Sequence, residues 1–445
     1  MKSQIYKLIL GFFIILIFCG TIFLSLPWVA NRQVPLIDRI FTVTSAVCVT
    51  GLTVLDISST FNFAGQLIIL LLIQVGGLGY MILGTLIIVL FGKLSLVQKS
   101  AVGESLNVVE FNTISQIIPL MKKVLILTFI FEFIGALLLF LKFFIAEQLS
   151  VSTSIWYAVF HSVSAFCNAG FSLFPDSFVR YRGDLAINII IPLLIISGGL
   201  GFFVWLEILQ VLRKRKENFS LHTKIVVLMT LVLVLIGMLV IFIFNNYNFS
   251  LQKIPFKTRV LISWFQAVTP RTAGFNTFPI QELSPVSIMI IILLMFIGSS
   301  PGGTGGGIKT TTFFVLMSSV YNYIAGERYV TVFKRRIDTN VILKSFTIFF
   351  ISLCWVFLVS MLFSWFNYTY DVVKFSFKEI FFETVSAFGT VGLSLGITPY
   401  IDNFAKILLI LTMLFGRVGG LAILSLLLTK EQKEIKYLEE PISVG

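Results

Sequence analysis

Four short segments of the chain share small or hydroxylated residues that end in a glycine and an apolar residue. The segments are residues 45–52, 164–171, 266–275 and 386–393, and their glycines are Gly51, Gly170, Gly274 and Gly392. About 110 residues separate one glycine from the next, a spacing that indicates an internal repeat. Because glycine adopts left-handed backbone at little cost, such loops can turn their carbonyl oxygens to one side. Rings of backbone carbonyls replace the hydration shell of a cation in selective pores.

The charge of these segments narrows the class of ion. None of the four contains Asp or Glu, so a carboxylate ring of the kind used for divalent cations is disfavoured. A helix that ended at each segment would also direct its partially negative C-terminus toward the site. The pattern therefore predicts a site for a weakly hydrated monovalent cation.

A glycine-rich run follows the third segment. It reads Gly302-Gly303-Thr304-Gly305-Gly306-Gly307-Ile308-Lys309, and Pro301 precedes it. A phosphate-binding loop requires lysine directly after glycine, and here Ile308 separates Gly307 from Lys309. Because the run interrupts an apolar stretch, we expect a flexible loop that crosses the ion path and acts as a gate.

Two basic residues fall inside apolar stretches. Ionisable side chains are costly in a membrane, which makes Lys309 and Arg417 candidates for function. Arg417 is expected to donate to the carbonyls of the loop, although a helix-locking or snorkelling role is an open alternative for both residues. Glu132 and Glu383 are interpreted as buried hydrogen-bond acceptors, and His161 lacks a partner pattern.

The elements that position these residues must be membrane helices. Of the 445 residues, 57% are hydrophobic and only 12% are charged, against about 25% charged residues in soluble domains. This small number of charged residues cannot cover the surface of a water-soluble protein of this size. The chain is therefore predicted to cross the membrane several times. The net charge of +12 comes from basic residues beside apolar stretches, which argues against nucleic acid binding.

Each repeat has the same hydropathy profile, in which a long apolar span, a half-length segment and a second long span follow one another. The first spans are predicted at 8–27, 124–145, 224–245 and 342–366, the half-length segments at 38–47, 155–166, 258–268 and 377–388, and the second spans at 66–91, 185–211, 285–323 and 404–429. Irregular backbone at membrane depth is tolerated where it lines water or lies buried in protein. The predicted fold is therefore an all-α membrane protein with eight full spans and four re-entrant half-helices around one central pore.

The repeats also define the predicted units. These are residues 1–92, 93–212, 213–324, which contains the gating loop, and 325–445, which includes a cytoplasmic C-terminal tail. Most of the 33 Lys and Arg residues lie near the termini and between units. By the positive-inside rule both termini are cytoplasmic and the glycine segments open outward. A docking role for these basic residues is an open alternative.

The chain resembles the Trk/Ktr/HKT superfamily of potassium transporters, and within it the membrane subunit of bacterial Ktr-type uptake systems. The resemblance rests on the four units, the signature glycines and the run ending Gly-Gly-Gly-Ile-Lys, and it covers essentially the whole chain. It implies a gating loop at Gly302–Lys309 that Arg417 opposes. It also implies a backbone potassium filter made of Val49, Thr50, Gly51, Asn168, Ala169, Gly170, Thr272, Ala273, Gly274, Thr390, Val391 and Gly392.

The resemblance further implies a homodimer in a bacterial plasma membrane, stimulation by sodium, and a cytosolic regulatory ring that binds nucleotide. Potassium would be the substrate, and this chain itself would hold no cofactor. Plant-type members with Ser at the first filter position favour sodium, so Gly51 argues for potassium. Uptake of sodium or of monovalent cations without selectivity is the alternative within this fold.

Two other functional classes fit less well. Inverted repeats of an alternating-access transporter need an odd number of spans in each unit, whereas each unit here has two full spans. An enzyme would need a cluster of His, Cys or acidic residues, and the sequence offers none.

Overall fold

The computed structural model describes residues 2–91, 114–245, 254–370 and 373–419. The boundary predicted between residues 92 and 93, the predicted C-terminal tail and the basic residues Lys93, Lys99, Lys430, Lys433 and Lys436 lie outside these ranges. The described residues are mostly helical, and their helices follow one order of long, short and interrupted elements four times.

A long apolar helix begins each quarter of the described fold. These helices are α1 (Lys2–Leu24), α6 (Ile114–Leu141), α10 (Leu221–Asn245) and α15 (Thr339–Tyr370), and α6 continues into the π-helix η1 (Lys142–Ala146). Their apolar stretches run over Lys7–Leu24, Met121–Ala146, Leu221–Asn245 and Thr339–Tyr370, and each is long enough to cross a membrane. Many of their large side chains are exposed, as lipid-facing helices require.

A short helix follows each long one. These helices are α2 (Leu36–Val47), α7 (Val151–Phe166), α12 (Phe256–Val268) and α16 (Phe377–Gly389). They have 12, 16, 13 and 13 residues, against the roughly 20 that a full crossing needs. Ser150 and Ser376 cap α7 and α16, and Glu379 completes a capping box with Ser376.

The third element of each quarter is interrupted at glycine. α4 (Phe63–Phe91) is kinked at Gly79, and α8 (Leu185–Leu200) meets α9 (Phe202–Leu212) at Gly201 with a bend of 96°. α13 (Pro285–Phe296) and α14 (Thr310–Ile324) are separated by the glycine-rich run, and α17 (Asn403–Val418) ends at Gly419. Gly79, Gly201 and Gly419 all have positive φ, which explains why glycine is needed at these breaks.

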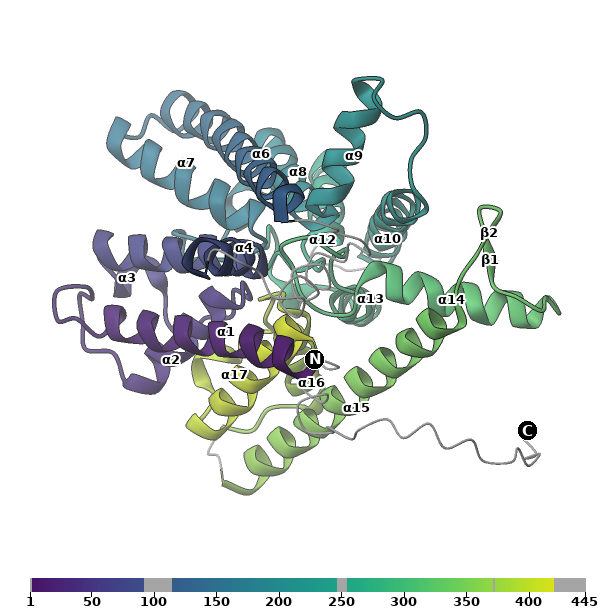
Figure 1. The fold of residues 1–445 in the computed structure, drawn as a ribbon. Coiled ribbons are helices and arrows are strands. Elements are labelled where there is room, and N and C mark those ends of the chain that lie inside the picture. Colours follow the sequence, from purple (N-terminus) through teal and green to yellow (C-terminus); the bar gives the residue numbers. More distant parts are fainter. Residues whose placement is uncertain (1, 92–113, 246–253, 371–372, 420–445) are drawn as a thin grey trace.

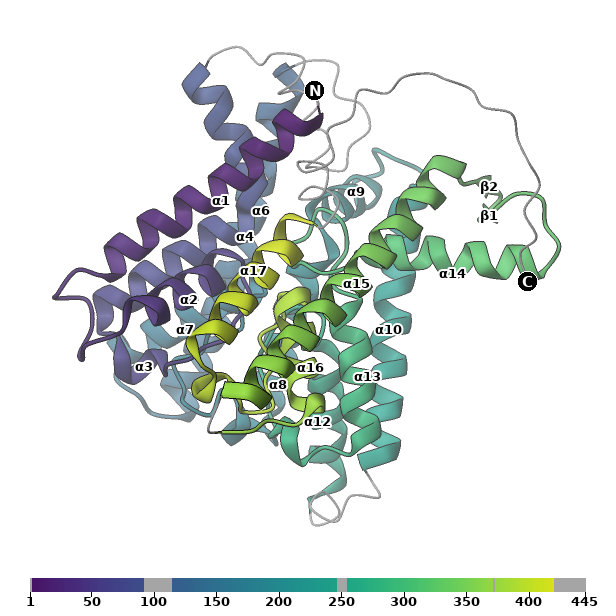
Figure 2. The ribbon, with the colours of Figure 1, turned by 90° about the horizontal axis from the view of Figure 1, so that it is seen from below.

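The remaining elements are small. They are α3 (Ile57–Thr60), the 3₁₀ turns η2 (Val179–Tyr181), η3 (Ile280–Glu282) and η4 (Thr398–Tyr400), and the antiparallel strands β1 (Thr331–Val332) and β2 (Arg335–Arg336). The two strands and the end of α14 project from the bundle in Figures 1 and 2.

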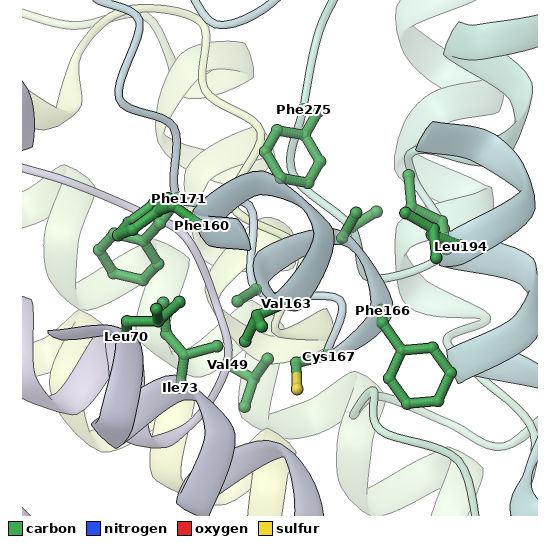
Figure 3. Close-up of a cluster of buried hydrophobic side chains, with 14 of the residues drawn as sticks. Val49, Leu70, Ile73, Phe160, Val163, Phe166, Cys167, Phe171, Leu194 and Phe275 are labelled. Carbon is green, nitrogen blue, oxygen red and sulfur yellow. The ribbon is translucent and has the colours of Figure 1, made fainter. Parts of the chain in front are cut away.

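The quarters follow one another around a common centre. In Figure 1 the chain passes from α1 and α2 through α6 and α7, then α10 and α12, to α15 and α16, so each short helix lies in its own sector. The largest buried apolar cluster packs α2, α7 and α12 against the glycine segments that follow them. Figure 3 shows part of it, with Val49, Leu70, Ile73, Phe160, Val163, Phe166, Cys167, Phe171, Leu194 and Phe275 labelled.

The structure confirms a helical fold with several apolar helices. By length and composition, four described helices could cross a membrane, or five when α8 and α9 count as one bent span. Shorter apolar helices occupy Phe63–Gly79 and Pro285–Phe296, because glycine interrupts the second long stretches. The count of eight full spans and the unit boundaries stay predictions.

Candidate functional site

The predicted filter segments all have the same unusual backbone. Within four residues of the end of each short helix, φ is positive at a residue and again at the glycine two positions later. The pairs are Val49 (56°) and Gly51 (90°), Asn168 (59°) and Gly170 (71°), Thr272 (71°) and Gly274 (78°), and Thr390 (49°) and Gly392 (89°). Residues with side chains rarely adopt this conformation, and strained backbone of this kind gathers at functional sites.

The middle residue of each segment is hydrogen-bonded back to its own unit. Its N–H donates to a carbonyl near the end of the short helix. The bonds run from Thr50 to Ser45 (2.7 Å), Ala169 to Ser164 (2.7 Å), Ala273 to Thr269 (2.9 Å) and Val391 to Ser386 (2.9 Å). This bond satisfies the amide inside the unit, and the carbonyl of the same residue lies toward the neighbouring unit.

The four segments close into a ring. A Cβ placed on Gly51 would lie 2.5 Å from the Ala169 carbonyl oxygen and 3.0 Å from the Gly170 Cα. In the same way Gly170 faces the Ala273 carbonyl, Gly274 faces that of Val391, and Gly392 faces that of Thr50. The chain of neighbours therefore returns to its start after four steps. We call these twelve residues, from Val49–Gly51, Asn168–Gly170, Thr272–Gly274 and Thr390–Gly392, the filter ring.

Hydroxyl and amide groups support the filter ring from behind. The N–H groups of Gly51 and Gly392 donate to Ser45 Oγ (3.0 Å) and Ser386 Oγ (3.1 Å). Asn168 Nδ2 donates to Thr272 Oγ1 in the next unit (3.1 Å), which joins two neighbouring segments directly. With these contacts, most of the ring's donors are used, and its carbonyls remain as the acceptors that a cation requires.

A cavity of about 600 Å³ lies on one side of the ring. We call it the mouth cavity. Its lining includes the four filter glycines and the residues that follow them, such as Ser172, Asn276 and Ser394. Arg32, Asp56 and Asp176 add charges to the lining, and Arg180 donates two hydrogen bonds to Asp176 (2.9 and 3.2 Å). These bonds raise the pKa of Arg180, so its guanidinium stays charged.

The glycine-rich run lies against the other side of the ring. A Cβ on Gly305 would collide with the Thr272 side chain, and one on Gly306 with that of Thr390. Gly306 N–H donates to Thr390 Oγ1 (3.0 Å), and Gly302 to Gly306 are buried. The predicted loop therefore exists and packs directly beneath two members of the filter ring.

Other units bind this loop. Ser300 and Thr304 N–H donate to the Gly199 and Gly198 carbonyls of the second unit (both 3.1 Å). The Gly302 carbonyl accepts from the N–H of Phe202, the first residue of α9 (3.1 Å). Gly303 fits closely here, since an added Cβ would lie 2.8 Å from the Gly199 carbonyl oxygen. The break in the second unit is thus a docking place for the loop of the third.

Both basic residues that the sequence places in apolar stretches contact the loop. Arg417 donates to the Thr304 carbonyl and also to the carbonyls of Gly76 and Gly77 in the first unit, the latter at 3.2 Å. Lys309 Nζ donates to the Gly305 carbonyl (2.6 Å). Arg417 therefore connects three units, whereas Lys309 closes a contact within the loop. Their part in gating stays a prediction.

One group of contacts lies outside the predictions from the sequence. His161, which has no partner pattern in the sequence, lies on α7 and contacts Ser172 just beyond Gly170. Glu383 accepts hydrogen bonds as predicted, but its donors, Ser394 and Thr398, belong to the mouth cavity. Aligning the repeats on their glycines would have placed both residues at one position. Glu132 also accepts hydrogen bonds as predicted, from Gln74 (3.2 Å) and from Cys167, the residue before Asn168.

Comparison with known proteins identifies the family of the chain. The cation transport protein family TrkH matches residues 4–436. The Ktr system potassium uptake protein B of Bacillus subtilis is 38% identical over 98% of this chain and 96% of its own length. The potassium/sodium uptake protein NtpJ of Enterococcus hirae is 36% identical over all of this chain and 97% of its own.

A solved structure shows the same fold. It is the potassium transporter TrkH from Vibrio parahaemolyticus, which superposes with a TM-score of 0.73 over 96% of this chain and 85% of its own, at 19% identity. The match extends across all four quarters of the described chain. The chain therefore belongs to the TrkH family of cation transport proteins, a family of membrane transporters and not of enzymes.

Proposed function

We propose that this protein takes up potassium through the filter ring by gated, passive conduction. The closed ring of four glycines, each facing the carbonyl of the next unit, carries this proposal. Carbonyl oxygens around one axis can replace the water around a potassium ion. The membrane potential would drive entry with about 2.3 kcal/mol per 100 mV for each charge.

The names of the relatives support potassium as the substrate. The Bacillus subtilis and Vibrio alginolyticus relatives are both potassium uptake proteins of the Ktr system, at 38% and 33% identity. Gly51 at the first filter position agrees with this substrate. The resemblance also supports activation by sodium. It further supports potassium as the only metal that the chain binds, through the ring.

The loop at Gly302–Gly307 with Lys309 is proposed to be the gate, and Arg417 is proposed to hold it closed. Its backbone lies directly beneath Thr272 and Thr390 on the side away from the mouth cavity, so a cation leaving the ring would meet it. Flexible glycine backbone can move aside at low cost once its hydrogen bonds are broken.

The assembly and orientation are proposed from the same resemblance. The protein would form a homodimer in the bacterial plasma membrane, with both termini cytoplasmic and the mouth cavity outside. A cytosolic ring that binds nucleotide would regulate it, as the description of relatives as parts of a Ktr system supports.

A transport assay tests the proposal. The full-length chain would be expressed in a bacterium that lacks its own potassium uptake, and growth at low external potassium would be measured with and without sodium. Purified protein in liposomes would then give the ratio of potassium to sodium flux. We expect the chain to restore growth and to conduct potassium faster than sodium. If it does not restore growth at low external potassium, the proposal is wrong.

Uptake without selectivity is the second candidate function. The Enterococcus hirae relative is named for both potassium and sodium, which favours this alternative. Equal fluxes of the two ions in the same liposomes would establish it in place of potassium selectivity.

A further inference from the structure

One position on the short helices differs in chemistry between the units. It lies five residues before the last apolar residue of each helix, and it holds Thr42, His161, Ser263 and Glu383. Two units thus have a hydroxyl at this position and two have a titratable group. In the filter ring Gly170 and Gly392 are not neighbours, so the units of His161 and Glu383 are diagonally opposed.

In the two opposed units this residue is bonded to the mouth cavity. His161 Nε2 lies 3.1 Å from Ser172 Oγ and accepts from the Leu173 N–H at 3.2 Å. Glu383 Oε1 accepts from Ser394 Oγ at 3.0 Å and from the Thr398 hydroxyl. Ser172 and Ser394 occupy matching places, two residues after Gly170 and Gly392.

The two serines are matched in a second respect. Each accepts a hydrogen bond from the N–H two residues later, from Phe174 to Ser172 (2.9 Å) and from Gly396 to Ser394 (2.8 Å). The same small turn therefore forms above the ring in both units. In each case its serine is joined through one hydrogen bond to the short helix behind the ring.

The hydroxyls of the other two units do something different. Thr42 Oγ1 donates to the Asp38 carbonyl (2.8 Å) and Ser263 Oγ to the Arg259 carbonyl (2.9 Å), both within their own helix. The matching residues after the glycines are Thr53 and Asn276. The bond from this helix position to the mouth turn is therefore described for the second and fourth units. In the third unit the short helix reaches the segment after the glycine from another position, through Gln266 Nε2 and the Phe278 carbonyl (3.1 Å).

His161 and Glu383 are held firmly in place. Both are completely buried. The Leu173 N–H can only donate, so Nε2 of His161 is unprotonated and Nδ1–H donates to the Tyr157 carbonyl (2.7 Å). The imidazole also stacks on Phe174 at 4.6 Å between ring centroids. The hydrogen bonds described for the two side chains go to residues outside the ring, so each acts on an ion through the residues that it binds.

We propose that His161 and Glu383 are positioning residues that fix the outer end of the filter ring in two opposed units and thereby set its discrimination between potassium and sodium. This inference rests on the proposed function. A ring that can relax fits the smaller sodium ion better, so a bond that prevents relaxation favours potassium. Because the two bonds lie in diagonally opposed units, together they limit the width of the ring along that diagonal.

The test removes the bond from either end and measures the ratio of potassium to sodium flux for the full-length chain in liposomes. Glu383→Leu, Ser394→Ala and Ser172→Ala are each expected to lower this ratio about fivefold to tenfold, the size of one lost buried hydrogen bond. Glu383→Gln retains an acceptor oxygen and is expected to restore most of the ratio.

Thr42→Val and Ser263→Ala are the matched controls, because they alter the same helix position where the side chain bonds its own helix. Both should keep the wild-type ratio. If Ser394→Ala and Ser172→Ala transport with an unchanged ratio, or if the controls change it equally, the inference is wrong. The two serine variants still test the inference if Glu383→Leu does not insert into the membrane. A wild-type chain without selectivity would contradict the proposed function and this inference together.

Discussion

The filter ring and the loop beneath it are both rich in glycine, but different forces hold them. In the ring, each segment is bonded to its own short helix, and glycine is needed because the neighbouring backbone lies too close for a side chain. The loop is held by Arg417 and Lys309, which donate to its carbonyls, and by the second unit, whose Gly198 and Gly199 carbonyls accept from its N–H groups. A ring of this kind is rigid, whereas a loop held by a few side chains can be released.

The largest effect should come from the ring. Gly392→Ser adds a side chain where the Thr50 carbonyl already lies, at φ 89°. Left-handed strain alone costs about 1–2 kcal/mol, so the ratio of potassium to sodium flux should fall about tenfold or more. Flux measurements in liposomes provide the test.

Gly326→Ser is the control for that change. Gly326 also has positive φ (73°), but nothing lies within 4 Å of an added Cβ. It should strain the backbone similarly and leave selectivity unchanged. Equal ratios for both variants would show that close packing of the ring does not determine selectivity.

Shortening the loop should have the next largest effect. Deleting Gly303–Gly305 removes the backbone that packs beneath Thr272 and binds the second unit. We expect potassium leak through liposomes to rise by more than tenfold, since this deletion takes away several hydrogen bonds at once. The potassium to sodium ratio should change little, because the ring is bonded within its own units. An unchanged potassium leak would show that this loop is not the gate.

Arg417→Gln should release the loop only in part. It weakens the bonds to Thr304 and to the first unit, and a hydrogen bond to a charged group contributes about 1.5–3 kcal/mol. Resting potassium flux should rise about tenfold. The control is Lys406→Gln on the same helix, whose ion pair with Asp38 (2.7 Å) does not involve the loop. A similar rise in both variants would point to a general defect of α17.

Lys309→Gln should have the smallest effect. Its bond to the Gly305 carbonyl (2.6 Å) stays within the loop, and glutamine can still donate there. Resting flux is expected to rise about twofold to threefold, consistent with the loss of less than 1 kcal/mol. A larger rise than that of Arg417→Gln would reverse the order of the two anchors.

Much of the helical pattern could be predicted because it is local. The four half-length segments coincide with α2, α7, α12 and α16, since helix length follows from the length of an apolar run. The breaks in the second long apolar stretch of each unit could also be predicted, because glycine in the sequence marks them locally. The bend of 96° at Gly201 could not be predicted, because it depends on the loop that packs there.

By itself, the sequence determined the repeat, the membrane class and the residue types of the site, all of which depend on spacing and composition. Only the tertiary structure decided which carbonyl each glycine faces, that Arg417 reaches the first unit and that His161 and Glu383 bind the mouth turns. These contacts join residues far apart in the chain. Their existence depends on how the quarters pack around one centre, which no local pattern encodes.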